Sequence, residues 1–380
     1  MNGRKQSFSI LSEKLNSADK TIWFHAASLG EFEQGLPVME AFKKKFPNHK
    51  LVVTFFSPSG YEVRKNNTVA DVTIYLPWDT KRNVKKFLKI VKPEKAIFVK
   101  YEYWINYLSE LKKQNIPTYL ISGIFRENQA FFKWYGGFYR RALHCFTHFF
   151  VQNESSKKLI ETLGFKNVTV SGDTRFDRVF AISERNNHLD FVEKFKSNHL
   201  LVVAGSTWEP DEKLLTEYIN QNKSTTKLVI APHNIKSEQI QSLKSQINKS
   251  VVLFSEKEGK NLSDFDVMII DTIGILTKIY SYADIAYVGG GFGNPGVHNV
   301  LEPAVFGIPI VIGKNYSHFA EATELVNLNG IISIKTQDEL NQIFDKLNND
   351  SSFRQEKGKI CAEFIMSQKG ATQKIMNYDL

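Results

Sequence analysis

The feature that most limits how this chain can fold is an alternation of short apolar runs with amphipathic stretches, which stops once and then starts again. In the first half, seven runs are typical of buried parallel strands: residues 21–26, 51–56, 72–76, 96–99, 118–121, 148–151 and 168–171. Helix-like segments separate them, for example residues 32–45, 83–90 and 155–163. Strands that alternate with helices in this way predict an open α/β sheet with helices on both faces.

The pattern pauses over residues 180–198, which are polar and charged, and it then resumes with six further strand-like runs: residues 200–204, 227–231, 251–254, 267–270, 285–288 and 308–312. A chain of 380 residues is too long for one ordinary core. We therefore predict two Rossmann-like domains, 1–179 and 199–351, joined by a linker at 180–198. A C-terminal helix within 352–380 is expected to pack back toward the first domain. Two such domains predict a ligand cleft at the carboxyl ends of their strands.

The net charge of +9 favours anionic partners, which include nucleic acid, anionic lipid and phosphorylated substrates. The two cysteines, Cys145 and Cys361, are far apart and lack metal-ligand spacing, as in a reduced cytoplasmic protein. No apolar run approaches the roughly 20 residues that span a bilayer, and the polar, basic start is no signal peptide. A soluble or membrane-peripheral protein is expected.

The first strand-to-helix turn, Ala27-Ser28-Leu29-Gly30, leads directly into Glu31. Small residues at such a turn bring the backbone amides of the helix start close to whatever occupies the cleft. Glu31 is then expected in the first helical turn, at the cleft floor. A glutamate is also common at that position simply because the helix dipole favours it, and for an isolated Glu that explanation is the better one.

The glycine-rich stretch 289–296 formally contains G-x-G-x-x-G from Gly291 to Gly296. An NAD site should also have an acid at the end of the next strand. Here that strand ends in Gly313-Lys314. We therefore interpret the stretch as a loop that lets a nucleotide or sugar approach the backbone, with Gly290 and Gly291 as candidate contacts.

Four further features of the second half suit a nucleotide. Ser206 and Thr207 offer amides and hydroxyls to a phosphate, Pro232 and His233 could hold a base, and Gly274 and Ile275 open a helix that could receive an anion. Asn299 and Glu302 follow the glycine loop. His298 and Glu302 are four residues apart and on a helix would face the same way, where Glu302 could accept ribose hydroxyls. A merely capped, solvated helix start is the alternative for Glu302.

The first domain carries a second carboxylate, Glu102, between aromatic residues at the end of a buried strand. It could orient a sugar or support Glu31, or be a solvated helix start. The stretch 131–141 mixes aromatic with basic residues, including Lys133, Arg140 and Arg141. Such a helix could dock at an anionic membrane or hold a phosphorylated lipid, or it could simply bury its aromatic residues.

These segments, together with Ser171-Gly172-Asp173-Thr174-Arg175-Phe176-Asp177 and Asp271-Thr272-Ile273-Gly274, resemble the Kdo transferases of lipopolysaccharide assembly, in order and over nearly the whole chain. The family has the GT-B glycosyltransferase fold. Its members transfer 3-deoxy-D-manno-octulosonic acid (Kdo) from CMP-Kdo to the lipid A precursor at the cytoplasmic face of the bacterial inner membrane.

The resemblance implies that Glu31 is the general base and Glu102 a second acceptor-side carboxylate. It implies donor contacts from residues at the strand ends of the second domain: Ser206, Thr207, Pro232, His233, Gly274, Ile275, Gly290, Gly291, Asn299 and Glu302. On the acceptor and membrane side it implies Ser28, Gly30, Arg126, Lys133, Arg140 and Arg141. We expect no metal, no cofactor besides the donor CMP-Kdo, and no nucleic-acid partner.

Three departures from the family pattern stand out. Pro232-His233-Asn234 replaces the usual Pro-Arg-His, Ile275 replaces a usual Glu, and the sequence starts without the family's N-terminal membrane anchor, as in a trimmed or naturally short form. Two alternatives stay open: another GT-B enzyme that uses a UDP-sugar, and a non-catalytic protein that binds nucleotide or anionic lipid.

Overall fold

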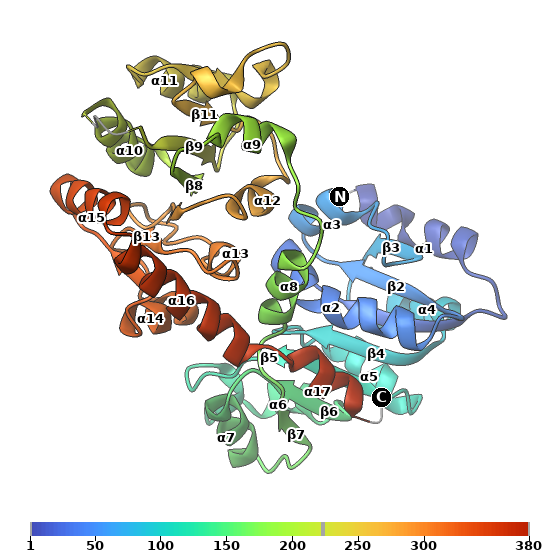
Figure 1. The fold of residues 1–380 in the computed structure, drawn as a ribbon. Coiled ribbons are helices and arrows are strands. Elements are labelled where there is room, and N and C mark those ends of the chain that lie inside the picture. The colour runs from blue at the N-terminus through green and yellow to red at the C-terminus, as the bar shows by residue number, and fades with distance from the viewer. Residues whose placement is uncertain (1, 222–224, 379–380) are drawn as a thin grey trace. The chain divides into compact units, whose positions relative to one another are not determined.

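The computed structural model describes residues 2–221 and 225–378 and confirms the predicted α/β architecture. It divides into two compact units. The first comprises Met1–Arg178 and Gln368–Leu380, and the second comprises Val179–Ser367. Each unit is built on one seven-stranded parallel sheet (Figure 1).

The sheet of the first unit has the order β3-β2-β1-β4-β5-β6-β7. Its strands are β1 (Lys20–His25), β2 (His49–Phe55), β3 (Val72–Tyr75), β4 (Pro93–Val99), β5 (Thr118–Gly123), β6 (His148–Val151) and β7 (Val168–Val170). These runs are almost continuously apolar because both faces of the sheet are covered. Trp23, Val52 and Phe98 pack on one face, while Phe24 and Val53 pack on the other.

The helices of the first unit are α1 (Asn2–Lys14), α2 (Leu29–Lys45), α3 (Pro58–Arg64), α4 (Lys81–Val91), α5 (Ile105–Lys113), α6 (Gly137–Leu143), α7 (Glu154–Thr162), α8 (Thr174–Ser183, which crosses the unit boundary) and α17 (Ala371–Asn377), with a 3-10 turn η1 (Ala130–Phe132). They begin where the sequence offers caps. Thr80 accepts a hydrogen bond from the amide of Asn83, and Asn153 accepts one from Ser156. Asp177 accepts hydrogen bonds from the amides of Gly370 and Thr372, and so fixes the start of α17.

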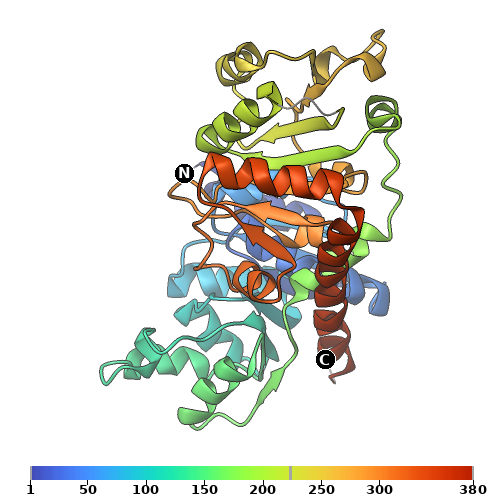
Figure 2. The ribbon, with the colours of Figure 1, turned by 60° about the vertical axis from the view of Figure 1, so that its left-hand side comes forward.

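The sheet of the second unit has the order β10-β11-β9-β8-β12-β13-β14. Its strands are β8 (Leu201–Thr207), β9 (Lys227–Pro232), β10 (Val251–Leu253), β11 (Val267–Ile269), β12 (Ile285–Val288), β13 (Ile310–Ile312) and β14 (Ile331–Ser333). Its helices are α9 (Asp190–Lys196), α10 (Glu209–Gln221), α11 (Ser237–Gln246), α12 (Leu276–Tyr280), α13 (Leu301–Ala304), α14 (Ala320–Asn327), α15 (Gln337–Asn349) and α16 (Ser351–Gln368), with 3-10 turns η2 (Phe254–Glu256) and η3 (Leu262–Asp264). Figure 2 gives a second view of these elements.

The strand orders locate one crevice in each unit. In an open parallel sheet, ligands bind outside the carboxyl ends of the strands where the strand order reverses. That point lies between β1 and β4 in the first unit and between β8 and β12 in the second. The carboxyl end of β8 carries Ser206, and the segments that follow β1, β4 and β12 carry Glu31, Glu102 and the glycine-rich loop.

The structure departs from the prediction in several places. It contains two elements that were not predicted, α1 and β14. In the sequence, α1 shows only scattered apolar residues, and β14 is only three residues long. The C-terminal helix is divided at Gly370, whose φ of +106° is a left-handed conformation that no helix interior accommodates. Residues 131–141 form η1, a turn and α6 instead of one helix. The segment 180–198 holds the end of α8 and all of α9, and the last two residues of 352–380 lie outside the described part.

Candidate functional site

Glu31 lies in the first turn of α2, directly after β1, as predicted. Its Oε2 accepts hydrogen bonds from the backbone amide of Ser28 at 2.7 Å and from the Ser28 hydroxyl at 2.5 Å. This is the capping arrangement that an acid at this position forms. Across the described residues, no hydrogen bond reaches Oε1, so one carboxylate oxygen caps the helix and the other is available to a ligand.

Glu102 follows the adjacent strand β4 and lies before the N-cap of α5 (Trp104), so the alternative of an exposed helix start is wrong. Its side chain is 13% exposed. Its Oε2 lies 2.6 Å from the indole Nε1 of Trp104, which donates to it, and 3.1 Å from Nε2 of His25. His25 is fully buried at the end of β1, and its Nδ1 lies 2.8 Å from the hydroxyl of Thr54. The two carboxylates of the first unit therefore follow neighbouring strands, and Glu102 is held rigidly.

The predicted acceptor residues fall into two groups. Ser28 and Gly30 lie at the start of α2, and Arg126 follows β5. The guanidinium of Arg126 lies 5.8 Å from the ring centre of Tyr101, the residue before Glu102. Burial raises the pKa of the Tyr101 hydroxyl, although the nearby Arg126 opposes the shift. This first group therefore surrounds the carboxyl ends of β1, β4 and β5.

The second group, Lys133, Arg140 and Arg141, belongs to the η1–α6 segment. Four aromatic side chains there are exposed: Trp134 (92%), Tyr135, Phe138 and Tyr139. We call these four residues the aromatic patch. Phe131 is buried instead, and Arg140 donates to the backbone oxygen of Lys133 at 3.2 Å. The alternative that this segment simply buries its aromatic residues thus holds for Phe131 and fails for the aromatic patch.

In the second unit, a buried carboxylate that the sequence analysis did not single out organises the glycine-rich loop. Asp211, in the first turn of α10, has no exposed surface. It accepts hydrogen bonds from the amide of Gly290 (2.8 Å), the amide of Trp208 (2.9 Å) and the hydroxyl of Tyr287 (2.8 Å). Burial raises the pKa of Asp211, and the amides of Gly290 and Trp208 partly offset the shift.

The glycines of this loop serve backbone packing. Gly290 has a φ of +91°, which favours glycine, and a Cβ on Gly291 would lie 2.7 Å from the Cα of Gly313. Gly290 and Gly291 are both buried, so these glycines let the loop pack closely against neighbouring backbone. Ser206 at the end of β8 also has a positive φ, +54°, at a bulge in the ladder with β9. Thr207 is buried, and its hydroxyl donates to Glu212.

Three rings are stacked beside the loop. His233 lies over both Trp208 and His298, with ring centres 4.5 and 4.7 Å apart, while the centres of Trp208 and His298 are 6.3 Å apart. The Trp208 indole donates to Nε2 of His298 at 2.8 Å. Burial lowers the pKa of His298, and the neighbouring His233 adds to the shift. We refer to these residues as the ring stack.

The prediction that His298 and Glu302 share one helix face is wrong. The helix α13 starts only at Leu301, so His298 lies in the preceding loop and belongs to the ring stack. Glu302 accepts hydrogen bonds from Thr277 (2.8 Å) and Asn299 (3.0 Å). This pairing brings Asn299 and Glu302 together beside α12, whose start carries Ile275 and the exposed Gly274.

The predicted donor residues of the second unit thus either end β8 and β9, as Ser206, Thr207 and Pro232 do, or follow β9, β11 and β12. Within residues 2–221 and 225–378, no group of three or more His, Cys, Asp or Glu side chains is arranged to hold a metal ion. In that same part of the chain, no helix is long and apolar enough to cross a membrane. Of the residues that the prediction missed, Asp211 was signalled only as an acid near a helix start, and Trp208 had no signal.

The fold of the chain is that of the two-domain GT-B proteins. It resembles the UDP-GlcNAc 2-epimerase of Neisseria meningitidis with a TM-score of 0.66 and 15% identity, covering 94% of this chain and 98% of that one. It resembles MurG of Acinetobacter baumannii with a TM-score of 0.55 and 13% identity, covering 94% and 98%. At these identities the likeness establishes the fold alone.

The sequence relatives are more specific. Residues 2–178 match the family model of the 3-deoxy-D-manno-octulosonic-acid transferases (kdotransferases). A transferase of that name from Chlamydia trachomatis is 26% identical, covering 97% of this chain and 87% of its own. Those from Aquifex aeolicus (28%; 80% and 79%) and Haemophilus influenzae (26%; 94% and 86%) are similar over most of their length. Residues 2–178 thus carry the Kdo transferase family domain, and over most of its length the chain is similar to glycosyltransferases of that family.

Proposed function

We propose that the protein transfers Kdo from CMP-Kdo to a primary sugar hydroxyl of the lipid A precursor, lipid IVA, in lipopolysaccharide inner-core synthesis. The observation that carries this proposal is the position of Glu31. It follows the first strand of a unit that matches the Kdo transferase family, at the strand-order reversal, with Oε1 unbonded among the described residues. A carboxylate in that state can accept a proton from a hydroxyl group.

In the proposed mechanism, Glu31 removes the proton of the acceptor hydroxyl as its oxygen attacks the anomeric carbon of Kdo. The bond between that carbon and the phosphate oxygen breaks, and CMP leaves with the electron pair. An oxocarbenium-like transition state attacked from the opposite face inverts the configuration. Glu102, held by His25 and Trp104, orients the acceptor sugar. Ser28, Gly30 and Arg126 are the acceptor contacts in this proposal.

The donor is proposed to bind the second unit at the carboxyl ends of β8, β9, β11 and β12. Glu302 and Asn299 suit the ribose hydroxyls, because their paired side chains present both acceptor and donor groups. The first turn of α10 already holds three acids, Glu209, Asp211 and Glu212, so its helix start is a poor phosphate site. We therefore assign the phosphate to the amides around Gly274, and the base to Pro232 and His233.

Transfer is expected to proceed without a divalent metal, because CMP carries a single phosphate and needs less countercharge than a pyrophosphate. Dialysis against EDTA should leave the initial rate of transfer within about twofold of that of the untreated protein. Loss of a Lewis-acid metal would lower the rate far more, because such a metal stabilises the transition state by several kcal/mol. Strong inhibition that Mg²⁺ restores would contradict this proposal.

The aromatic patch and its basic neighbours are proposed to contact the cytoplasmic face of the inner membrane. Exposed Trp and Tyr with Lys and Arg suit the interface of an anionic bilayer. Replacing Trp134 by Ser and Arg141 by Glu should lower binding to vesicles of 30% phosphatidylglycerol about tenfold or more. One basic residue near such a surface contributes about 1 kcal/mol to binding, and the loss of the indole adds to this effect.

Arg140 is left in place in this variant because it supports the turn through the oxygen of Lys133. The control for the change in charge is Lys158→Glu, a substitution of an exposed basic residue on α7. It should leave vesicle binding close to that of the wild-type protein. Equal vesicle binding by the variant and the wild-type protein would refute the membrane contact.

The deciding experiment is transfer from freshly generated CMP-Kdo to tetraacylated lipid A precursor, with the products resolved by mass spectrometry. One or more additions of the Kdo mass are expected. Titration with CMP and UDP separates the remaining alternatives. A preference for UDP would indicate a UDP-sugar enzyme, and tight CMP binding without turnover would indicate a non-catalytic binding protein.

A further inference from the structure

The second unit contains a pocket at the free edge of its sheet, away from the strand-order reversal. Its volume is about 570 Å³, and it is lined along β14 by residues from the loop after β13 and from α14, α15 and α16. Since β14 ends the strand order, its outer edge pairs with no described strand. Pockets of this size accommodate small ligands. We call it the β14 pocket.

The floor of the β14 pocket is apolar. Ile332, Ile343 and Phe353 pack against the core of the second unit and are half-buried. The ammonium groups of Lys346 and Lys357 lie 3.9 and 5.0 Å from the ring centre of Phe353. Val326 at the end of α14 joins them. Such a surface gains free energy when a hydrocarbon group displaces water from it.

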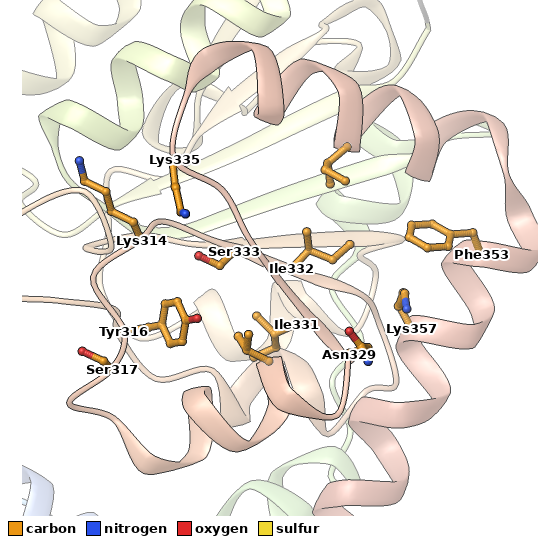
Figure 3. Close-up of a pocket in the computed structure, with 12 residues that line it drawn as sticks. Lys314, Tyr316, Ser317, Asn329, Ile331, Ile332, Ser333, Lys335, Phe353 and Lys357 are labelled. Carbon is orange, nitrogen blue, oxygen red and sulfur yellow. The ribbon is translucent and has the colours of Figure 1, made fainter.

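The charged residues that line the pocket are all lysines, although the carboxylate of Glu339 lies nearby and accepts a hydrogen bond from the backbone amide of Lys335 at 2.6 Å. Lys314, Lys335 and Lys357 line the β14 pocket, and none of its described lining residues is an Asp or Glu. Lys357 pairs with Glu356 at 3.3 Å, whereas neither Lys314 nor Lys335 forms an ion pair with any residue of 2–221 or 225–378. Figure 3 shows Lys314, Lys335, Ser333 and Tyr316 on one side of the pocket, with Ile332 between them and Phe353.

We propose that the β14 pocket binds an anionic amphiphile. Its phosphate head lies between Lys314 and Lys335, within reach of the Ser333 and Tyr316 hydroxyls, and its aliphatic body covers Ile332, Ile343 and Phe353. The proposal does not depend on the donor and acceptor roles assigned above, and none of the residues that line the pocket is among those assigned to them. Lysines also protect sheet edges from pairing with other chains, but edge protection alone does not require the apolar floor.

The probe is hexyl phosphate, titrated calorimetrically into the full chain. Inorganic phosphate and 1-hexanol should each bind at least tenfold more weakly, because each offers only half of the complementary chemistry. Butyl phosphate should bind about fifteenfold more weakly than hexyl phosphate if both lost methylenes were buried, at about fourfold for each. Hexyl phosphate that binds no tighter than inorganic phosphate would overturn the proposal.

The lysines are tested by a double replacement, Lys314→Ala with Lys335→Ala, which should weaken hexyl phosphate about tenfold. The control is Lys194→Ala with Lys213→Ala, two exposed lysines of the same unit whose loss changes the net charge equally. Equal weakening in both variants would reduce the effect to overall charge and refute the site. Displacement of hexyl phosphate by CMP would also refute the site, because it would indicate that the probe binds in the donor site. Gly313, next to Lys314, packs against Gly291 of the glycine-rich loop, which makes this control necessary.

The two sources of such a ligand are separated by competition. Phosphatidylglycerol vesicles that displace hexyl phosphate, where phosphatidylcholine vesicles do not, identify a lipid in the bilayer. Displacement by neither, with hexyl phosphate still bound through Lys314 and Lys335, identifies a monomeric amphiphile. Either result supports the pocket.

Discussion

Replacing Glu31 by Gln is expected to lower the turnover number for Kdo transfer by about a hundredfold or more, the usual contribution of a general base. Glutamine has the same shape and can still accept the hydrogen bonds of Ser28 through its amide oxygen, so the cap of α2 survives. What it loses is the ability to take up a proton. The melting temperature and the affinity for CMP should therefore stay close to those of the wild-type protein while turnover collapses.

Two controls separate chemistry from capping in that experiment. Glu40→Gln changes the same charge at an exposed position of the same helix and should leave turnover unaffected. Ser28→Ala removes the hydroxyl from the cap but keeps the backbone amide that Glu31 accepts. It should cost about 1 kcal/mol of stability and leave the carboxylate of Glu31 in place, with a large part of the turnover. Near-normal turnover by Glu31→Gln would rule out Glu31 as the base, whatever the controls show.

The fold was predictable because its strands are buried on both faces. Runs such as Ile22-Trp23-Phe24 have only apolar residues where a half-exposed strand would alternate, and this signal survives without any knowledge of the partners. The signal fails for β14, which has three residues at a sheet edge, and at Gly370, where a left-handed residue interrupts an otherwise helical pattern. Each of these features involves three residues or fewer, which is too short for hydrophobic periodicity to detect.

The site was predictable in position but not in its contacts. The carboxyl ends of parallel strands meet at one edge of the sheet, so Glu31 and Glu102 could both be predicted to lie at that edge. Nothing in the sequence indicates that Glu102 binds His25, 77 residues away. Likewise, the pairing of His298 with Trp208 depends on where α13 begins, and the spacing from His298 to Glu302 suggested a helix that starts too early.

Asp211 shows most clearly what local sequence leaves open. It stands in the first turn of the helix after the first strand of its unit, as Glu31 does, and accepts the amide of Trp208 as Glu31 accepts that of Ser28. The two carboxylates are locally equivalent. One retains an oxygen without a described partner, while the other is covered completely by the glycine-rich loop and Tyr287. Tertiary packing alone assigns one to chemistry and the other to support.

Replacing Asp211 by Ala should therefore destabilise the second unit severely, by about 3 kcal/mol or more, because each buried donor left without a partner costs about 1–3 kcal/mol and three are affected. The loop should loosen with it. Hydrogen exchange followed by mass spectrometry should show faster exchange in peptides that contain Gly290, and CMP should bind more weakly. Unchanged protection around Gly290 would show that Asp211 does not hold the loop.

Two milder variants test the same network without unfolding it. Tyr287→Phe removes one hydrogen bond, and in Asp211→Asn the amide oxygen can keep both backbone donors while the Tyr287 hydroxyl turns to accept from the new amide. Each should cost about 1 kcal/mol.

The pH dependence of the stability that Asp211 contributes has a definite sign. Since burial raises the pKa of Asp211 above 3.8, the folded protein binds this proton more tightly than the unfolded chain. The contribution of Asp211 to stability therefore falls as the pH rises through that range. The stability advantage of the wild-type protein over Asp211→Asn should accordingly be larger at pH 4 than at pH 7 in urea unfolding, and an advantage that grows with pH would contradict the raised pKa.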